Sequence, residues 1–244
     1  MSKIPKKPDD IFGEFTNDLK SIYGDNLESI ILYGSSARGE YKYKKSDINF
    51  LIILKDNTPS ELSRYNPIMK KWLKMNVSIP LFLTGEYINK SLDTFPIEFL
   101  EMSSAYNVIY GDDVFANIQI KNKDLKHQIE RELRGKLLHL RLEFLKTCLN
   151  TKKIQDLISK SLFTFIPIFK AILKLVEHES KSKNEGILQR ISELINLNYN
   201  LFVKLLSISK KELTLKENEI KDIFDKYIEE MDRVVDYVDK LEVI

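Results

Sequence analysis

The sequence contains one cysteine, Cys148, and three histidines, and none of them has the spacing of a metal motif. One thiol cannot form an internal disulfide, and no zinc motif is completed. No apolar run approaches the ~20 residues of a membrane span, and no signal-peptide core follows the basic start. We therefore expect a cytoplasmic protein with no membrane association, in which Cys148 is a buried structural thiol within an apolar helical pattern.

An excess of either charge is also lacking. Lys and Arg number 38 and Asp and Glu 36, which gives a formal net charge of +2. Such a balance provides no global field that would favour a nucleic-acid partner. Any anionic ligand must therefore be attracted by a local group of residues.

Glycine and proline are scarce in the second half of the chain. After Asp113 the only ones are Gly135, Pro167 and Gly186. Short strands need frequent turns, whereas long helices need few chain breakers. The contrast predicts an α+β protein with a small mixed-sheet domain at residues 1–118 and an α-helical bundle at residues 119–244.

Hydrophobic periodicity predicts the elements of both halves. In the first half, helices are expected around residues 11–22, 60–75 and 86–91. Strands are expected at residues 29–33, 48–54, 79–84, 95–102 and 107–110. In the second half, amphipathic helices are expected from residue 125 to 144, 154 to 176, 187 to 206 in two pieces, and 220 to 241. Pro167 is expected to kink or break the second of these helices.

One stretch combines residues suited to phosphate and metal binding. A predicted strand ends at Gly34-Ser35-Ser36, which we expect to open a short helix, and Arg38 follows. Glycine allows close backbone approach, hydroxyl and amide donors suit phosphate, and arginine adds a permanent positive charge. A second strand begins near Asp47, whose carboxylate is a hard oxygen ligand for Mg²⁺. Residues 47 and 49 of a strand would point to the same face.

This arrangement resembles the nucleotidyltransferase superfamily of DNA polymerase β, in its branch of aminoglycoside and minimal nucleotidyltransferases. The family pattern is a hydrophobic residue, Gly-Ser, a spacer of about ten residues, and Asp-x-Asp or Asp-x-Glu between hydrophobic residues. Tyr33, Gly34, Ser35 and Asp47 match it, and the resemblance covers residues ~8 to 112. Asn49 departs from it, because the family has a second carboxylate there.

The resemblance implies a third carboxylate on a later strand, acting as base or metal ligand. Glu98 is the first candidate, because Phe95, Ile97 and Phe99 alternate onto the other face, and Glu101 is the second. The alternative is that Glu98 is only a solvent-facing residue. A surface role is likewise the alternative for Arg38.

The resemblance implies Mg²⁺-dependent transfer of a nucleoside monophosphate from a nucleoside triphosphate, ATP included, to an acceptor. Gly34, Ser35, Ser36 and Arg38 would hold phosphates, and Asp47 and Glu98 would be catalytic. The metal ligands would be Asp47, Asn49 and Glu98. The acceptor is open: a small molecule, a protein or a nucleic-acid end. A different class of function is a nucleotide-binding regulatory or antitoxin-like module, impaired in catalysis because of Asn49.

The helical half offers two further hypotheses. His127, Arg131, Arg134 and Arg141 share one side of the first long helix, so Arg131 and Arg134 are candidate triphosphate ligands, with a solvated basic face as the alternative. Arg134 and His139 also fit the Arg-x4-His pattern of HEPN ribonucleases. These two lie about 140° apart around a helix, so they would converge only with help from another helix or subunit. A homodimer through the helical half is also possible.

Overall fold

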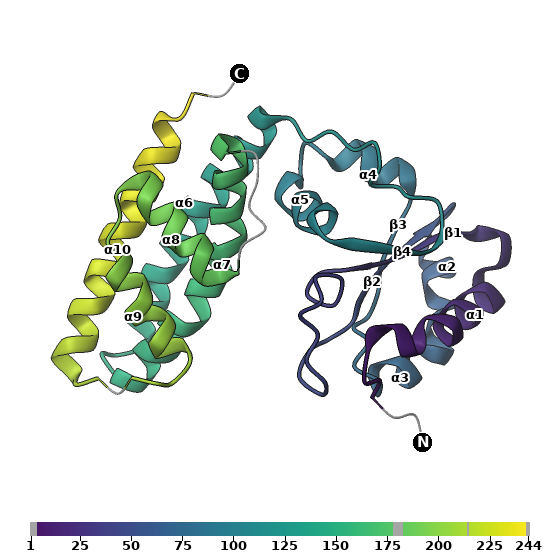
Figure 1. The fold of residues 1–244 in the computed structure, drawn as a ribbon, viewed down its shortest axis with the longest axis horizontal. Helices are drawn as coiled ribbons and strands as arrows, with labels where there is room; N and C mark the ends of the chain where they lie inside the picture. The colour runs from purple at the N-terminus through teal and green to yellow at the C-terminus, as the bar shows by residue number, and fades with distance from the viewer. Residues whose placement is uncertain (1–3, 178–182, 214, 243–244) are drawn as a thin grey trace. The chain divides into compact units, whose positions relative to one another are not determined.

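The computed structural model describes residues 4–177, 183–213 and 215–242, and the chain divides into two compact units. The first unit spans Met1–Ile120 and the second spans Lys121–Ile244. The division falls two residues after the predicted boundary at 118. The first unit contains a mixed sheet and the second is helical, as the sequence pattern predicts (Figure 1).

The sheet of the first unit has four strands in the order β3-β2-β1-β4 among the described residues. Their bounds are β1 Leu27–Tyr33, β2 Asn49–Leu54, β3 Leu81–Leu83 and β4 Tyr106–Gly111. β1 pairs antiparallel with β2 and β4, whereas β3 is parallel to β2. The antiparallel register sets Tyr33 opposite Asn49, so the end of β1 and the start of β2 lie side by side.

Helices cover both faces of this sheet, because the central strands are apolar on both sides. On one face, Ile30 and Phe50 pack against Phe15 of α1 (Phe12–Tyr23) and Trp72 of α3 (Asn66–Leu73). On the other, Ile31, Leu51 and Ile53 pack against α4 (Gly85–Ser91) and α5 (Pro96–Ser104). Fully buried runs of this kind are typical of strands covered on both faces. The short elements η1 (Pro8–Ile11), η2 (Gly24–Asn26) and α2 (Pro59–Ser63) complete the unit.

Two sequence predictions in this unit are wrong. Residues 95–102 are not a strand, because they lie mostly in α5, whose buried residues Pro96, Phe99 and Met102 recur at helical spacing. Proline at the first helical position has no amide hydrogen to lose, so it favours a helix start there. The predicted helix at 60–75 is two helices, and Asn66-Pro67 begins the second.

The second unit is a bundle of five helices in its described part (Figure 1). They are α6 Asn122–Lys146, α7 Thr151–Glu177, α8 Asn184–Ile195, α9 Tyr199–Ser209 and α10 Glu217–Lys240. α7 contacts the other four, and Ile158, Leu162 and Phe169 on it are fully buried. The helix continues through Pro167, so the predicted break does not occur.

Cys148 is exposed, which contradicts the expectation of a buried thiol. α6 ends at Lys146, and Cys148 and Leu149 both have positive φ, at 49° and 61°. The helix therefore ends two residues before the cysteine. No helix of the described residues is long and apolar enough to cross a membrane.

Candidate active site

The Gly34-Ser35-Ser36 segment is a compact turn that follows β1 directly, rather than the short helix that the sequence suggested. Gly34 has φ +77°, a conformation that a residue with a Cβ rarely adopts. The turn is closed by amide-to-carbonyl bonds from Arg38 to Gly34 (3.1 Å) and from Glu40 to Ser35 (2.9 Å). The chain therefore reverses tightly at the end of β1 and returns toward β2.

This turn leaves backbone donors unused. Within the described chain, the amides of Ser35, Ser36 and Ala37 have no hydrogen-bond acceptor. Ser35 is partly exposed and Ser36 is buried. Successive unpaired amides after a strand are well suited to bind an anion, because each N–H carries a partial positive charge. The turn thus offers donors to an anion without a helix N-terminus.

Asp47 and Asn49 lie beside this turn. Ile48 and Phe50 are fully buried on one face of the sheet, so Asp47 and Asn49 lie toward the other face. The Ser36 hydroxyl donates to the carbonyl of Asp47 at 3.2 Å. A Cβ placed on Gly34 would be 3.6 Å from Nδ2 of Asn49. The structure therefore brings Gly34, Ser36, Asp47 and Asn49 together, as the spacing predicted.

Two tyrosines extend this site across the sheet. Tyr33 pairs with Asn49 on one side and with Tyr106 on the other, so the three lie in one row across β2, β1 and β4. Burial raises the pKa of Tyr33. Burial also raises the pKa of Tyr106, and the hydrogen bond that its hydroxyl donates to Asp113 (2.9 Å) raises it further. Tyr106 was missed in the sequence, and Tyr33 was recognised only as the hydrophobic residue before Gly34, because only the register of three strands could have aligned the two.

Glu98 and Glu101 lie on α5, not on a strand. Glu98 is exposed in the first turn of the helix and Glu101 is half-buried one turn later. An acidic residue in the first turn favours a helix through the macrodipole, which is a structural reason for Glu98. The alternation argument that set Glu98 opposite Phe95 and Phe99 therefore no longer holds. A catalytic role for Glu98 stays a prediction, supported by α5 covering the face that Asn49 shares.

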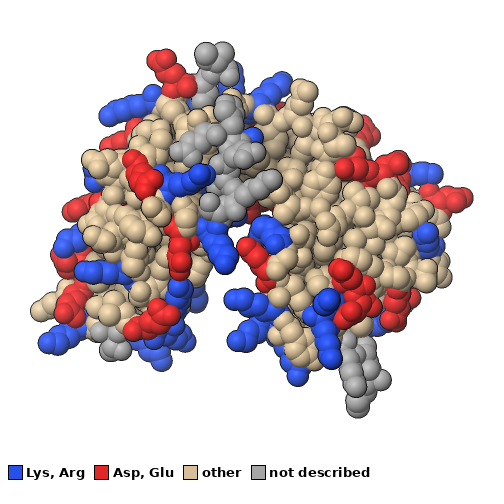
Figure 2. Space-filling view, in the orientation of Figure 1, with Lys and Arg blue, Asp and Glu red and all other residues tan. Residues whose placement is uncertain are grey.

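The loop between the turn and Asp47 is strongly basic. Arg38 pairs with Glu40 at 3.3 Å, so its charge is partly neutralised. Lys42, Lys44 and Lys45 are exposed, and none has a carboxylate partner among the described residues. Figure 2 shows blue side chains gathered at the lower edge of the first unit. The three lysines were missed, although the run Tyr-Lys-Tyr-Lys-Lys directly before Ser46-Asp47 was a visible signal.

Two basic residues of α6 have carboxylate partners on α10. Arg134 donates to Asp239 at 2.8 Å, and Arg141 donates to both carboxylate oxygens of Asp232 at 2.8 and 2.7 Å. His127 and Arg131 are exposed. Exposed pairs of this kind contribute little to stability, so a phosphate could displace Asp239 from Arg134. The triphosphate role of Arg131 and Arg134 stays a prediction.

The ribonuclease hypothesis gains no support from α6. Arg134 is held toward α10 by Asp239. The hydrogen bond from Lys146 lowers the pKa of Glu143, and His139 is near enough to add a smaller contribution in the same direction. The two side chains are therefore directed to different sides of α6. In the described chain they do not form a common site.

The donor set fits a magnesium ion that arrives with a triphosphate. No group of three His, Cys, Asp or Glu residues in the described chain could hold a metal by itself. Mg²⁺ usually keeps several waters and is bound by one or two carboxylates together with substrate phosphates. Asp47 provides the carboxylate, and Asn49 beside it can contribute an amide oxygen.

Comparison with known families decides what this turn and strand are. Residues 13–106 match the model of the family described as the nucleotidyltransferase domain. The first unit is a nucleotidyltransferase domain. The match contains nearly all of α1, the strands β1, β2 and β3, and both Gly34 and Asp47, and it ends at Tyr106, the first residue of β4.

Two proteins of Methanocaldococcus jannaschii, each named a putative protein adenylyltransferase, match shorter segments of this chain. One is 43% identical over 47 residues, which is 19% of this chain and 46% of that protein. The other is 52% identical over 40 residues, which is 16% of this chain and 39% of that protein. The matched segments thus span less than half of either relative.

A solved structure resembles the chain over both units. It is a spectinomycin adenyltransferase from Enterococcus faecialis, determined with ATP and spectinomycin. The TM-score is 0.57 at 11% identity, with 92% of this chain and 99% of that chain covered. This likeness shows a shared fold, in which a nucleotidyltransferase domain is followed by a helical domain.

Proposed function

We propose that the chain transfers a nucleoside monophosphate, AMP in the first instance, from a nucleoside triphosphate to an acceptor. The observation that carries this proposal is the turn at residues 35–37, whose backbone amides have no acceptor in the described chain and which lies beside Asp47 and Asn49. The names of the similar proteins describe transfer of an adenylyl group, which supports ATP as the nucleotide.

The residues divide the work by their chemistry. The amides of Ser35, Ser36 and Ala37 bind phosphate oxygens, and Lys42, Lys44 and Lys45 attract the triphosphate from solution. Asp47 holds the metal ion from the protein side, with Asn49 as a neutral ligand. Mg²⁺, when bound, would neutralise charge on the phosphates and fix their orientation. Positioning and electrostatic stabilisation supply most of the rate in phosphoryl transfer, and these residues provide both.

The chemical class of the acceptor is inferred from the similar proteins. The solved structure holds spectinomycin, and the relatives' names indicate a protein acceptor. A hydroxyl acceptor is common to a sugar-like drug and to a serine, threonine or tyrosine side chain. We therefore propose a hydroxyl as the accepting group, activated by Glu98 or Glu101 from α5.

A second candidate is a nucleotide-binding module without turnover, and Asn49 is the specific observation in its favour. Asparagine brings no charge to a position beside Asp47, so the metal site has one anionic ligand instead of two. A weaker metal site would still bind a triphosphate through the turn. Both candidates therefore predict binding, and only the first predicts pyrophosphate release.

The Asn49→Asp variant distinguishes them. The substitution replaces an amide with a carboxylate of nearly the same shape, so packing against Gly34 is kept. Pyrophosphate release is measured with each triphosphate and a panel of hydroxyl acceptors, with Mg²⁺ and with a chelator. If the chain is an enzyme, the unmodified chain releases pyrophosphate, the release requires Mg²⁺, and Asn49→Asp raises its rate. For the binding module, metal affinity rises while turnover stays at background. Unchanged metal affinity would show that residue 49 does not face the metal.

A further inference from the structure

One face of α6 carries exposed leucines that the bundle does not use. Leu138, Leu142 and Leu145 are 60%, 48% and 72% exposed, and they recur at spacings of four and three residues. Leu149 continues the pattern in the turn after the helix and is 48% exposed. This stripe, Leu138 to Leu145, lies on the side of the helix roughly opposite the buried residues of α6. Apolar residues at this heptad spacing are typical of a helix that packs against a second helix.

Gly135 lies one heptad step before Leu142 in the same stripe. Glycine is the poorest helix former after proline, so a glycine in a helix interior needs a reason. A Cβ on Gly135 would meet no atom within 4 Å, so nothing in this chain requires its absence. Small residues in a helix surface allow the backbone of another helix, or a large side chain on it, to approach closely.

The charges beside the stripe are arranged for a second copy in antiparallel orientation. Lys146 lies one residue after Leu145, and Glu132 lies one residue after Arg131, which is one heptad before Leu138, so the two charges are on the same flank. If two α6 helices cross antiparallel between Leu138 and Leu142, Glu132 faces Lys146 of the partner subunit, and the pair occurs twice. The same register sets Leu145 against Gly135 of the partner subunit and Leu138 against Leu142 of the partner subunit.

The existing contacts of these charges are weak enough to be exchanged. Glu132 pairs with Lys136 at 3.2 Å and Lys146 with Glu143 at 2.6 Å, and both pairs are solvent-exposed contacts within one helix. Arg141 lies on the other flank near the crossing point, where it would approach Arg141 of the partner subunit. Asp232 neutralises that charge in each copy, so the register is not opposed.

We propose that the α6 stripe is a homodimer interface, with the two α6 helices antiparallel and Leu145 seated on Gly135 of the partner subunit. The interface belongs to the helical unit and does not depend on nucleotidyl transfer. Two heptads of helix bury less than the ~1,600 Å² of a standard interface, so a dissociation constant in the micromolar range is expected.

Charge reversal on the full-length chain tests the register. E132K alone makes both flanking pairs repulsive between cations, and K146E alone makes both repulsive between carboxylates. Each variant should raise the dimer dissociation constant at least tenfold in sedimentation velocity at low salt. An equal mixture of the two variants should restore dimers, because each pair then joins a cation to a carboxylate. K123E, on the same helix outside the stripe, changes the net charge as K146E does and should have no effect.

The G135A variant separates a role of Gly135 in the dimer from a role in the monomer fold, because the two measurements should change in opposite directions. Alanine should raise the thermal midpoint of the monomer, because it forms helix better, and at the same time weaken the dimer severalfold. L145E should abolish the dimer while the far-ultraviolet circular dichroism stays unchanged. A chain that is monomeric up to ~100 μM, far above the expected constant, overturns the proposal. So does a dimer that tolerates L145E, or a mixture of E132K and K146E that stays monomeric.

Discussion

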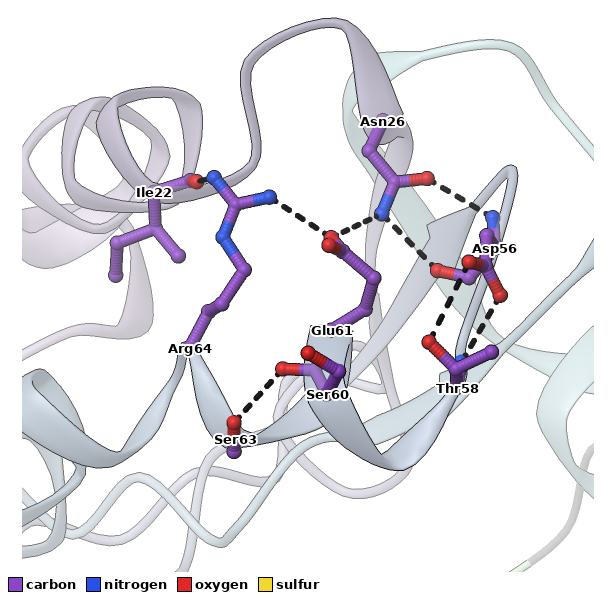
Figure 3. Close-up of polar contacts among 8 residues, drawn as sticks. All are labelled: Ile22, Asn26, Asp56, Thr58, Ser60, Glu61, Ser63 and Arg64. Carbon is purple, nitrogen blue, oxygen red and sulfur yellow. Dashed lines mark hydrogen bonds and ion pairs between the residues drawn. The ribbon is translucent and has the colours of Figure 1, made fainter.

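The two ends of β1 differ in how completely their polar groups are bonded. At the start of the strand, the Asn26 amide donates to the Asp56 carbonyl (3.0 Å) and the Glu61 carboxylate (2.7 Å), and it accepts from the Asp56 amide (2.9 Å). Arg64 donates to Glu61 at 2.8 Å and also to the carbonyl of Ile22. Figure 3 shows this network joining the end of α1, the end of β2, and α2.

At the other end of β1, several hydrogen-bond donors and cations have no partner within the described part of the chain. The amides of residues 35–37 are unpaired, and Lys42, Lys44 and Lys45 have no carboxylate beside them in the described chain. Polar groups that bond one another contribute to stability, whereas aligned donors without acceptors favour an anion. The comparison teaches that one end of the sheet fixes the strands, whereas the other end leaves donors free for the proposed ligand.

The largest expected effect is on activity, at the unpaired end. Asp47→Ala should lower the rate of pyrophosphate release at least 100-fold, because it removes the carboxylate proposed to hold the metal ion. Triphosphate affinity in the presence of Mg²⁺ should fall severalfold by calorimetry. Stability should change little, because the Asp47 side chain is exposed.

Asp56→Ala is the matched control at the opposite end of the sheet. It also removes one carboxylate, here the one that accepts from the amide and hydroxyl of Thr58. Its melting temperature should fall while triphosphate affinity stays within twofold of the unmodified chain. If both aspartate variants lost activity equally, the functional difference between the two ends would not exist.

The next effect is on stability, at the bonded end. Asn26→Ala removes three hydrogen bonds, one of them to a carboxylate, and should lower the free energy of unfolding by about 2 kcal/mol. Urea denaturation measures this change. Ser63→Ala removes only a local bond to the Ser60 carbonyl and should stay within ~0.5 kcal/mol. Equal losses from the two variants would mean that the network of Figure 3 contributes nothing beyond a surface contact.

The sequence predicted which residues meet at the Gly34 turn better than which residues meet at the bonded end. Gly34, Ser36, Asp47 and Asn49 were recognisable because a strand–turn–strand site needs particular residue types at short spacing. Asn26, Asp56 and Glu61 are up to 35 residues apart, and their meeting depends on the register of β1 and β2. Long-range hydrogen bonds of this kind leave no local pattern to read.

Glu98 shows a second limit of prediction from sequence, in which a local pattern is present but misleading. The alternation of Phe95, Ile97 and Phe99 is a good strand pattern over five residues, but it is too short to exclude a helix. Pro96 at the helix start and Met102 one turn after Phe99 decide for the helix. Cys148 was misplaced for a similar reason, because an apolar pattern does not show where its helix ends.

A moderate effect is expected from the basic loop. Replacing Lys42, Lys44 and Lys45 together by Ala should raise the dissociation constant for a triphosphate up to tenfold at low salt, and less at 0.5 M salt, because the attraction is screened. Replacing Lys152, Lys153 and Lys160 of α7 gives the same loss of charge and should change the affinity less than twofold. An effect that does not depend on salt would point to a structural role for the loop.

The smallest effect comes from the one group at the bonded end that lacks a partner. Tyr23 is 2% exposed, and its hydroxyl is the buried side-chain polar atom without a hydrogen bond in the described chain. Burial raises the pKa of Tyr23 to about 12, although the nearby Arg64 guanidinium lowers it in part. Tyr23→Phe removes a hydroxyl that was desolvated without compensation, so the free energy of unfolding should rise by up to ~1 kcal/mol at pH 7.

The pH dependence separates this explanation from a simple packing change. The folded chain holds the Tyr23 proton more tightly than the unfolded chain, whose tyrosines ionise near pH ~10. Above that pH the unfolded state binds fewer protons, so the stability of the unmodified chain falls as the pH rises from ~10 toward 12. Tyr23→Phe should make this fall shallower, as measured by urea denaturation at pH 7, 9, 10 and 11. A parallel decline in both chains, or a Tyr23→Phe variant less stable at pH 7, would show that the hydroxyl has a partner after all, and the bonded end of β1 would then be complete.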